Sequence, residues 1–241
     1  MNQNQPIIEA RNLVKSFPSG DGVLVVLKQL NFSVQEGEFV SVTGRSGSGK
    51  STLLYLMGLL DDATLGEVFI SGENVSNLSQ DEKTNMRLNS LGYIFQDYAL
   101  VPELTALENV LTPLLMQGLS KEEAYEKARK SLARFGLASK EENLPSQLSG
   151  GEQQRVSIAR AVAHDPKILF ADEPTANLDL ETSEIVLKTF LDLHKEGQTI
   201  IMVTHEPEYA KRTQRIVTLS DGVISSDELV LQKDERRTDL S

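Results

Sequence analysis

A glycine-rich segment between an apolar run and a helical pattern constrains the fold most strongly. Residues 44–51 read GRSGSGKS, a full match to the pattern GxxxxGK[ST] of phosphate-binding loops. The apolar run Phe39–Thr43 precedes the segment, and a helical pattern begins at Ser51. Strand, loop and helix in this order let the backbone wrap around a phosphate, with the amide groups of the helix start facing it. The alternative is an ordinary glycine-rich turn with an exposed lysine.

The residue types within this segment predict particular contacts. The ammonium group of Lys50 is expected to reach the β- and γ-phosphates of a nucleotide, and the hydroxyl of Ser51 is expected to ligate magnesium. The candidate nucleotide contacts of the segment are Gly44, Arg45, Ser46, Gly47, Ser48, Gly49, Lys50, Ser51 and Thr52.

The rest of the chain alternates short apolar runs with helical patterns. Uninterrupted apolar runs, typical of strands buried on both faces of a parallel sheet, occur at residues 39–43, 93–95, 168–171 and 199–204. Ser79, Thr105 and Ser120 each stand three residues before a glutamate, which predicts three helices that begin with a capping box. The side of the third helix expected to be apolar carries Ala124, Tyr125, Ala128, Leu132 and Phe135. This alternation indicates an α/β protein.

The end of the chain carries a hairpin signal. Two apolar stretches, residues 216–219 and 223–224, flank Ser220, Asp221 and Gly222, which favour a tight turn. After Ser225 the sequence is charged and patternless, so we expect no regular structure there.

Composition and charge exclude several classes of function. The 241 residues include 35 acidic and 24 basic side chains, with a net charge of −11, whereas bulk electrostatic binding of nucleic acid needs the opposite sign. Without cysteine, the chain has no disulfide, thiolate metal site or cysteine nucleophile. Neither a signal-peptide pattern nor an apolar run of the roughly 18 residues of a membrane span is found. We therefore expect a soluble, cytoplasmic protein that reaches a membrane only through a partner.

Two carboxylates end one of the apolar runs. Asp172 and Glu173 follow Ile168–Ala171, so they are expected at the carboxyl edge of the parallel sheet, where such folds bind ligands. Asp172 is expected to hold magnesium through a water, and Glu173 to take a proton from an attacking water. Taken alone, the pair also fits a strand that ends in a solvated acidic turn.

A second helix start has the character of an anion site. Residues 148–155 read LSGGEQQR, and apolar residues continue at helical spacing to Ala163. Ser149 is the expected N-cap, and the glycines beside it let an anion approach the helix start. Without context, a plain helix cap is the better interpretation. These residues do not explain why one chain needs two helix starts of this type.

The three segments, in this order, resemble the ATP-binding cassette family over nearly the whole chain, and residues 148–155 resemble its signature motif. The resemblance implies a P-loop NTPase core with a mainly parallel sheet, an N-terminal antiparallel β-subdomain and an inserted α-helical subdomain. One cassette would span residues 1–241, with the core in residues 1–95 and 156–241 and the helical subdomain in residues 96–155. ATP and Mg²⁺ are the implied cofactors. In this family two cassettes pair head to tail, so that Ser149, Gly150 and Gly151 would serve the partner's nucleotide.

The resemblance also assigns roles to single residues. Gln96 matches the glutamine that contacts magnesium, and His205 matches the histidine at the γ-phosphate. Glu173, His205 and Lys50 are the implied catalytic residues. The implied metal ligands are Ser51, Gln96 and Asp172.

Two further positions have both a family role and an ordinary one. Asp179 matches the loop that crosses the dimer interface, and it also fits an N-cap of the helix that runs to Gly197. Phe17 stands where the family stacks an aromatic ring on adenine. The alternative for Phe17 is a core residue at the end of a strand.

Residues 58–61, 100–110 and 172–179 resemble in particular the lipoprotein-release and macrolide-export branch (LolD/MacB-like). Arg45, Leu65 and Glu206 depart from the pattern of that branch. The resemblance implies an ATP-hydrolysing subunit that forms a homodimer when ATP is bound and powers a separate integral membrane permease. It would lie on the inner face of the cell membrane through that permease, and its expected task is export or extrusion of a lipophilic, peptide or lipoprotein cargo.

Other functions are distinguished by particular features. An FtsE-like, non-transport membrane machine is the alternative use of the same ATPase. A non-catalytic, nucleotide-gated module would lack Lys50, Glu173 or His205, and all three are present. A DNA-repair cassette would contain a long coiled coil, and no heptad run occurs here. A translation cassette would carry two cassettes in a longer chain. The signature motif and the acidic pair exclude a small-molecule kinase.

The membrane subunit is expected to dock near residues 96–118. Leu100 and Val101 are expected on the exposed part of this segment. In the helix opened by Thr105, we expect some apolar residues to form a groove for a partner helix. These residues are Leu107, Val110, Leu111, Leu114 and Leu115. The alternative is that all of them form the core of the helical lobe.

Overall fold

The strands form two sheets with different pairing. The computed structural model describes residues 5–20 and 22–230. The larger sheet has the strand order β10 (Val223–Leu229), β9 (Arg215–Ser220), β3 (Phe39–Gly44), β8 (Thr199–Val203), β7 (Ile168–Asp172) and β6 (Leu91–Ile94). The strands from β9 to β6 are parallel, while β10 forms an antiparallel hairpin with β9. The predicted parallel sheet and C-terminal hairpin are confirmed.

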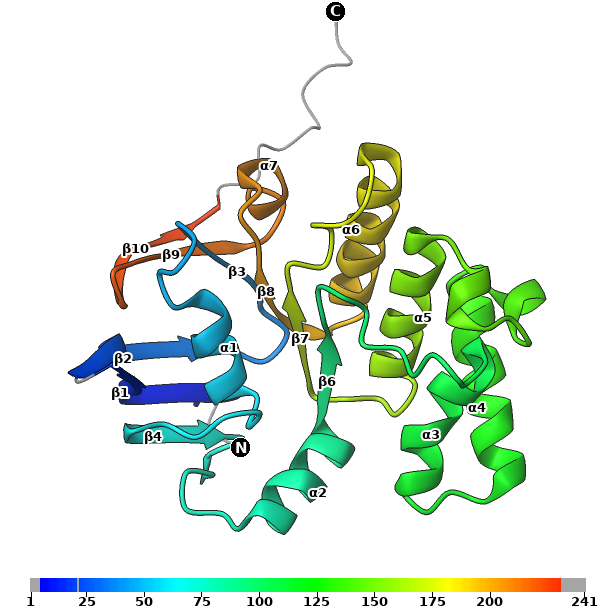
Figure 1. The fold of residues 1–241 in the computed structure, drawn as a ribbon, viewed down its shortest axis with the longest axis horizontal. Coiled ribbons are helices and arrows are strands. Elements are labelled where there is room, and N and C mark those ends of the chain that lie inside the picture. The colour runs from blue at the N-terminus through cyan, green and yellow to red at the C-terminus, as the bar shows by residue number, and fades with distance from the viewer. Residues whose placement is uncertain (1–4, 21, 231–241) are drawn as a thin grey trace, which may run out of the picture.

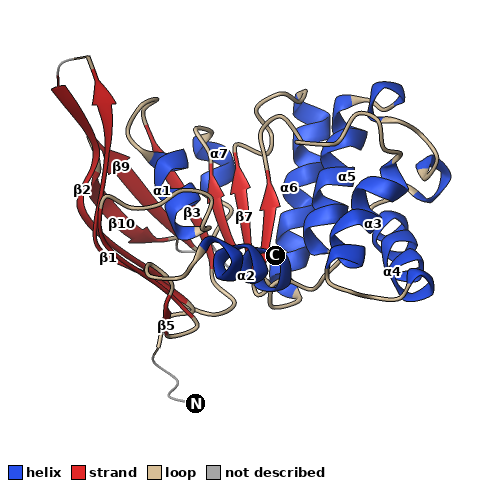
Figure 2. Ribbon diagram, turned by 60° about the horizontal axis from the view of Figure 1, so that its bottom comes forward, coloured by secondary structure: helices blue, strands red, loops and turns tan. Residues whose placement is uncertain are grey.

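The N-terminal sheet is antiparallel, as expected. Its order is β2 (Gly22–Val34), β1 (Ile8–Ser19), β4 (Leu65–Ile70) and β5 (Glu73–Asn74). Figures 1 and 2 show this sheet on one side of the molecule and a group of helices on the other, with the parallel strands between them. The α/β class, with an antiparallel N-terminal sheet beside a mainly parallel core, is therefore confirmed.

The helices belong to two groups. Those next to the sheets are α1 (Lys50–Met57), α2 (Gln80–Ser90), α6 (Leu180–Lys195) and α7 (Pro207–Ala210). A helical lobe, made of α3 (Ala106–Met116), α4 (Lys121–Arg134) and α5 (Gly150–Val162), packs together beyond α6 (Figure 1). Short 3₁₀ turns at Ala138–Lys140 and Pro145–Gln147 connect α4 to α5.

Four of the described helices begin with the same capping arrangement. In each, a Ser or Thr side chain accepts a hydrogen bond from the backbone of the third helical residue, whose glutamate side chain accepts one in return from the cap backbone. The three predicted boxes and the predicted N-cap at Ser149 are therefore confirmed. The pairs are Ser79 with Glu82, Thr105 with Glu108, Ser120 with Glu123, and Ser149 with Glu152.

The parallel sheet separates two apolar cores. Side chains alternate across a strand, so Leu169 and Ala171 of β7 lie in a core shared with α3, α4, α5 and α6. Ile168 and Phe170 lie in the other core, with α1 and the N-terminal sheet. The first core continues without a break from the sheet into the helical lobe. Since α5 also runs through residue 155, the division into residues 1–95, 96–155 and 156–241 remains a prediction.

Two expectations about secondary structure and burial are wrong. Tyr125 does not join the buried side of α4, because it is 38% exposed and its ring lies 5.8 Å from the guanidinium of Arg129. Residues 226–229, expected to have no regular structure, continue β10 because their backbone pairs with β9. Residues 1–4 and 231–241, which the sequence analysis also treated, lie outside the described residues.

The first core predicts where substitution is costly. Phe190 of α6 is fully buried, with its ring centroid 6.4 Å from that of Phe39. Phe190→Ala should lower the free energy of unfolding by about 3–5 kcal/mol, because it leaves a cavity. Urea denaturation followed by circular dichroism measures this loss. Leu180→Ala in the same helix, where the side chain is 74% exposed, should change stability by no more than about 0.5 kcal/mol. Equal losses in both variants would contradict the assignment of the core.

Candidate active site

The loop between β3 and α1 has a backbone shape that requires its glycines. Gly44, Gly47 and Gly49 have φ of 141°, 77° and 100°, where other residues are strained. A Cβ on Gly44 would lie 2.2 Å from the carbonyl oxygen of Leu219. Gly49 is the N-cap of α1, whose first N–H groups have no partner within the helix. The loop therefore ends at a helix start suited to an anion.

The polar atoms of the loop fit phosphate groups. Lys50 is buried, and its ammonium group donates to the carbonyl oxygens of Gly44 and Arg45 at 3.1 and 3.2 Å, so it lies over the loop. The hydroxyl of Ser48 is buried and has no hydrogen-bond partner among the described residues. A buried donor without a partner, beside a cation and an open helix start, matches the chemistry of a nucleotide phosphate.

Ser51 and Asp172 meet although 120 residues separate them in sequence. The Ser51 hydroxyl, at the start of α1, donates to the Asp172 carboxylate, at the end of β7, over 2.9 Å. Asp172 is only 5% exposed. Burial and this carboxylate together raise the pKa of Tyr55, on the next turn of α1, to about 12. A hydroxyl and a carboxylate are ligands that Mg²⁺ accepts, so the donor set fits the predicted metal.

Glu173 and His205 form a second polar contact at the same sheet edge. They follow the neighbouring parallel strands β7 and β8, and the Glu173 carboxylate hydrogen-bonds the His205 ring nitrogen Nδ1. The other ring nitrogen lies 3.3 Å from the Glu206 carboxylate. Glu173 has a φ of 49°, a left-handed conformation that costs a non-glycine residue about 1–3 kcal/mol. Backbone strain of this kind is typical of functional sites.

A hydrogen bond from a side chain to a backbone carbonyl joins the segments that follow β6 and β7. The side-chain amide of Asn177 donates to the carbonyl oxygen of Gln96 at 3.0 Å, and the Gln96 side chain is exposed. Asp179 caps α6 by accepting from the N–H of Thr182 at 2.8 Å. This hydrogen bond holds the pKa of Asp179 below its usual value. The capping role expected for Asp179 is confirmed, while its role at a dimer interface remains a prediction.

The second helix start lies apart from the phosphate loop within one chain. Ser149 is exposed, and among the described residues its hydroxyl bonds only the Glu152 N–H of its own capping box. Gly151 is buried, and a Cβ there would lie 2.2 Å from the methyl group of Thr182. The close packing of α5 on α6 therefore requires a glycine at position 151. Whether Ser149, Gly150 and Gly151 contact a second chain's nucleotide remains a prediction.

Phe17 is not a core residue. It lies within β1, is 39% exposed and has the ammonium group of Lys15 4.8 Å from its ring centroid. The alternative of a buried aromatic at a strand end is wrong. Stacking on adenine remains a prediction for this ring.

Comparison with known proteins identifies the family. The family model described as "ABC transporter" matches residues 27–176, which include both glycine-rich helix starts and the acidic pair. This chain belongs to the ABC transporter family. The fold, the match and the relatives below show that it is an ATPase cassette of that family.

Two relatives and one solved structure show the extent of the similarity. The lipoprotein-releasing system ATP-binding protein LolD of Aquifex aeolicus is 47% identical over 218 residues, 90% of this chain and 96% of LolD. The macrolide export ATP-binding/permease protein MacB of Pasteurella multocida is 45% identical over 95% of this chain. A dimeric post-hydrolysis structure of the ATP-binding cassette MJ0796, bound to ADP and Pi, matches with a TM-score of 0.87. It is 40% identical, over 93% of this chain and 99% of that one.

The cassette spans only part of some relatives. It covers about a third of MacB, 35% of the Pasteurella protein, which is described as both an ATP-binding and a permease protein. Among the described residues, no helix is both long enough and apolar enough to cross a membrane.

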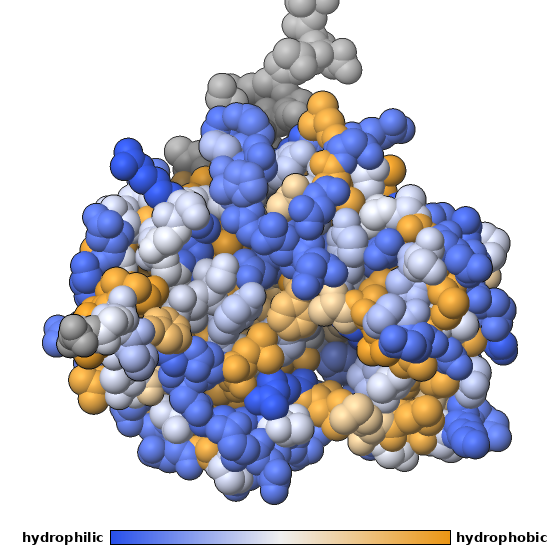
Figure 3. Space-filling view, viewed as in Figure 1, coloured by the Kyte–Doolittle hydropathy of each residue, from blue (hydrophilic) through white to orange (hydrophobic). Residues whose placement is uncertain are grey.

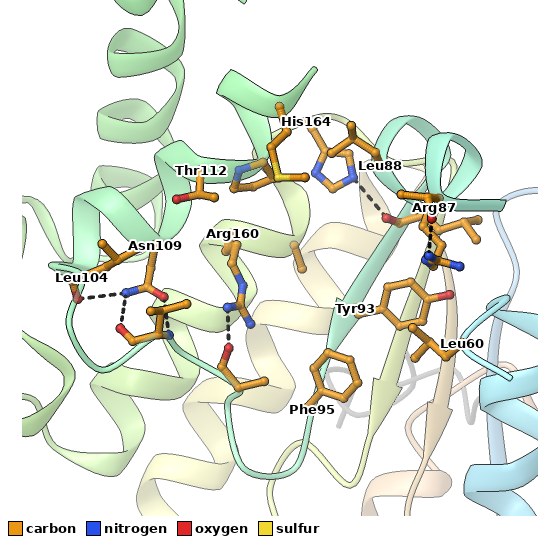
Figure 4. Close-up of a pocket in the computed structure, with 17 residues that line it drawn as sticks. Leu60, Arg87, Leu88, Tyr93, Phe95, Leu104, Asn109, Thr112, Arg160 and His164 are labelled. Atoms are coloured by element: carbon orange, nitrogen blue, oxygen red, sulfur yellow. Dashed lines mark hydrogen bonds between the residues drawn. The ribbon is translucent and has the colours of Figure 1, made fainter. Parts of the chain in front are cut away.

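The ABC cassette has an apolar groove beside the helical lobe. The groove lies between α2, β6, α3, α5 and the segment 95–104, and its volume is about 390 Å³ (Figure 4). Figure 3 shows a hollow with apolar side chains around it. Its basic side chains are Arg87 and Arg160, with His164 nearby, and no acidic side chain is among the described residues that line it. Apolar lining residues include Leu60, Leu88, Val101, Leu104, Pro113 and Met116.

The predicted lining of this groove is largely wrong. Leu107, Val110, Leu111 and Leu114 are at most 5% exposed because they form the core of the lobe. Leu115 is 38% exposed but does not line the groove, which α3 borders instead with Thr112, Pro113 and Met116. Leu100 also packs against the core, whereas Val101 is 44% exposed and lines the groove.

Sequence reasoning missed the residues that hold the segment after Gln96. Arg160 of α5 donates to the carbonyl oxygens of Tyr98 and Ala99 at 2.9 and 2.6 Å, and both of these residues have positive φ. Asn109 of α3, 2% exposed, bonds the backbone N–H and C=O of Val101 at 2.8 and 3.1 Å. An asparagine inside an apolar helix pattern was the one available signal. Nothing in the sequence marked Arg160.

The position of Lys50 generates a direct prediction. Lys50→Ala should weaken ATP binding by about 10- to 100-fold, because a buried phosphate loses a charge-assisted donor. Isothermal titration calorimetry with ATP and magnesium measures the change. Lys188→Ala, an exposed lysine on α6, should bind ATP like the unaltered protein. Unchanged affinity in Lys50→Ala would show that the loop does not hold the phosphates through this lysine.

Proposed function

We propose that the chain binds Mg²⁺-ATP on residues 44–52 and hydrolyses it with Glu173 as the general base. The observation that carries this proposal is the meeting of three elements at one edge of the sheet. The Ser51–Asp172 hydrogen bond joins the phosphate loop to β7, and the Glu173–His205 contact joins β7 to β8. Residues that suit phosphate, metal and proton transfer therefore lie side by side.

The chain's own residues would divide the work as follows. Gly44–Thr52 would hold the phosphates through backbone N–H groups and Lys50, and Phe17 would stack on the adenine. Ser51, Asp172 and Gln96 would hold magnesium, directly or through water. A bound magnesium ion would offset the negative charge of the phosphates. Glu173 would accept the proton of the attacking water, while His205 holds the carboxylate and faces the terminal phosphate.

Removal of the base tests this assignment. Glu173→Gln should still bind ATP, because the phosphate loop is unaltered, but should hydrolyse it about 10²- to 10⁴-fold more slowly. Release of inorganic phosphate measures turnover. Glu228→Gln, an exposed glutamate on β10, serves as the control and should hydrolyse ATP normally. Full turnover in Glu173→Gln would refute the assignment of the base.

The second helix start supports a head-to-tail homodimer. Within one chain the Ser149 hydroxyl accepts from the N–H of Glu152 in its own capping box. In the proposed dimer it would face the ATP of the second chain, beside Asp179. Glu173→Gln should then be a monomer without nucleotide and a dimer with ATP and magnesium on size-exclusion chromatography.

A pair of matched variants tests this interface. In the Glu173→Gln background, Ser149→Arg should abolish the ATP-dependent dimer. A bulky cation would then replace the hydroxyl that is proposed to lie beside the nucleotide. Ser120→Arg removes an equivalent capping box from α4, and it should leave the dimer intact. This control separates the effect at the interface from the loss of a helix cap, which costs about 1 kcal/mol. A dimer that persists with Ser149→Arg would place the interface elsewhere.

The groove beside the helical lobe supports docking of a membrane subunit. It is apolar and lacks acidic residues in its described lining, although the chain as a whole carries a net charge of −11. Such a surface suits a short apolar helix of a partner. Residues 98–104 form one wall of the groove and follow Gln96 closely in the sequence. One short segment would therefore carry both a nucleotide contact, at Gln96, and part of the docking surface. The cassette would thereby lie on the inner face of the cell membrane.

Docking is tested by a charge in the groove wall. Val101→Glu should keep ATP-driven dimerisation but lose association with membranes. Docking of the membrane subunit would bury the new carboxylate among apolar side chains, which is unfavourable. The fraction of the cassette that sediments with native membranes measures the effect. Val223→Glu, at 42% exposure nearly matched to the 44% of Val101, should sediment normally. Normal sedimentation of Val101→Glu would exclude the groove as the docking site.

The names of two relatives support a proposal for the cargo class. LolD is named for lipoprotein release and MacB for macrolide export, and both match 90% or more of this chain. We therefore assign the cassette to export or extrusion of a lipophilic, peptide or lipoprotein cargo. Co-purification of the permease from native membranes, followed by sequencing of that permease, identifies the system.

A further inference from the structure

The turn that carries Glu173 is strained at the point where β7 ends. The φ of Glu173 is 49°, and a proline follows it, although proline restricts the residue before it to extended conformations. Strain of this kind persists only where surrounding contacts hold the backbone. The contacts of this turn therefore decide where the Glu173 carboxylate points.

Backbone and side-chain hydrogen bonds hold the turn. The Glu173 N–H donates to the carbonyl oxygen of Val203 at 3.0 Å, and the Ala176 N–H donates to that of Glu173 at 3.1 Å. Pro174 has no N–H of its own, and its carbonyl oxygen accepts from the side-chain nitrogen Nε2 of Gln154 at 2.8 Å. This last contact reaches the turn from a different element, helix α5.

The Gln154 amide is fully buried, and its orientation is determined chemically. A carbonyl oxygen can only accept, so the nitrogen of the amide must face Pro174. The amide oxygen Oε1 has no partner among the described residues. A buried acceptor without a partner is unfavourable, and an apolar side chain of similar volume would avoid it. A glutamine at this position therefore differs from an apolar residue in one favourable respect: it donates the hydrogen bond to the Pro174 carbonyl oxygen.

We propose that Gln154 is a positioning residue for hydrolysis. Its amide fixes the Pro174 carbonyl and thereby holds the strained Glu173 backbone in the orientation that the base requires. This inference rests on the role of Glu173 proposed above. Ser149 caps the same helix, so Gln154 connects the helix start that would face a second chain's nucleotide with the base that acts on the chain's own nucleotide.

The substitution Gln154→Met tests this role. Methionine has a similar length and volume but cannot donate a hydrogen bond. The kcat for ATP hydrolysis should fall about 10- to 100-fold, because a misplaced catalytic group loses that much. The KM for ATP should stay within about twofold of the unaltered value, because residues 44–52 are untouched. Steady-state phosphate release over a range of ATP concentrations gives both constants.

A matched control separates positioning from structure. Ser157 lies in the same helix, is fully buried and has a hydroxyl without a partner among the described residues. Ser157→Ala should leave kcat unchanged. If Gln154 had only a structural role, its substitution would lower the melting temperature of the protein but leave the kcat of the folded fraction unchanged. If Gln154→Met does not fold, Gln154→Asn, too short to reach Pro174, replaces it with the same expected loss. A folded Gln154 variant with unaltered kcat would overturn the proposal.

A double variant shows whether Gln154 acts through Glu173. In the Glu173→Gln background, Gln154→Met should cause no further loss, because the group that it positions has gone. Losses that multiply would overturn the proposal. Full turnover in Glu173→Gln alone would contradict the base assignment and this inference together. Lost turnover in Glu173→Gln with unaltered kcat in Gln154→Met would contradict only the positioning role.

Discussion

The parallel pairing of β3, β8 and β7 is the constraint on which the site depends. Because the carboxyl ends of parallel strands meet at one edge, the phosphate loop, the acidic pair and His205 come together from distant parts of the sequence. Each strand is buried on both faces, between two cores. A shift of one residue in register would exchange the two faces, so the packing that stabilises the sheet also fixes the relative heights of the catalytic groups.

Helix α5 connects most of the features that surround this edge. Its first turn packs closely on α6 at Gly151, its middle reaches the turn after β7 through Gln154, and Arg160 holds the segment that follows β6. Its apolar side lies in the core that joins the helical lobe to the sheet. A displacement of α5 would therefore change the positions of Glu173 and of the groove wall at the same time.

The sequence predicted elements and local chemistry well, and contacts between distant elements poorly. Capping boxes and apolar runs are local, so the helix starts and buried strands followed from them directly. The lining of the groove did not, because helical periodicity shows that Leu107 and Leu114 share a face but not what covers that face. Gln154 and Arg160 were missed for a related reason: each acts on a backbone carbonyl, and any residue type supplies one. The role of His205 came from a family resemblance, whereas that of Glu173 also followed from its place at the end of a buried strand. The geometry is consistent with both roles.

The repeated capping box has a consequence for behaviour in acid. Hydrogen bonds from the capping serine hold the pKa of three of these glutamates below the ordinary 4.5: Glu82, Glu123 and Glu152. Because the folded value lies below the unfolded one, the boxes stabilise their helices at neutral pH, and this contribution is lost as the pH falls through the lowered values. Glu82 and Glu152 open α2 and α5, which both border the groove. Acid would therefore loosen the starts of helices on two sides of the groove at once.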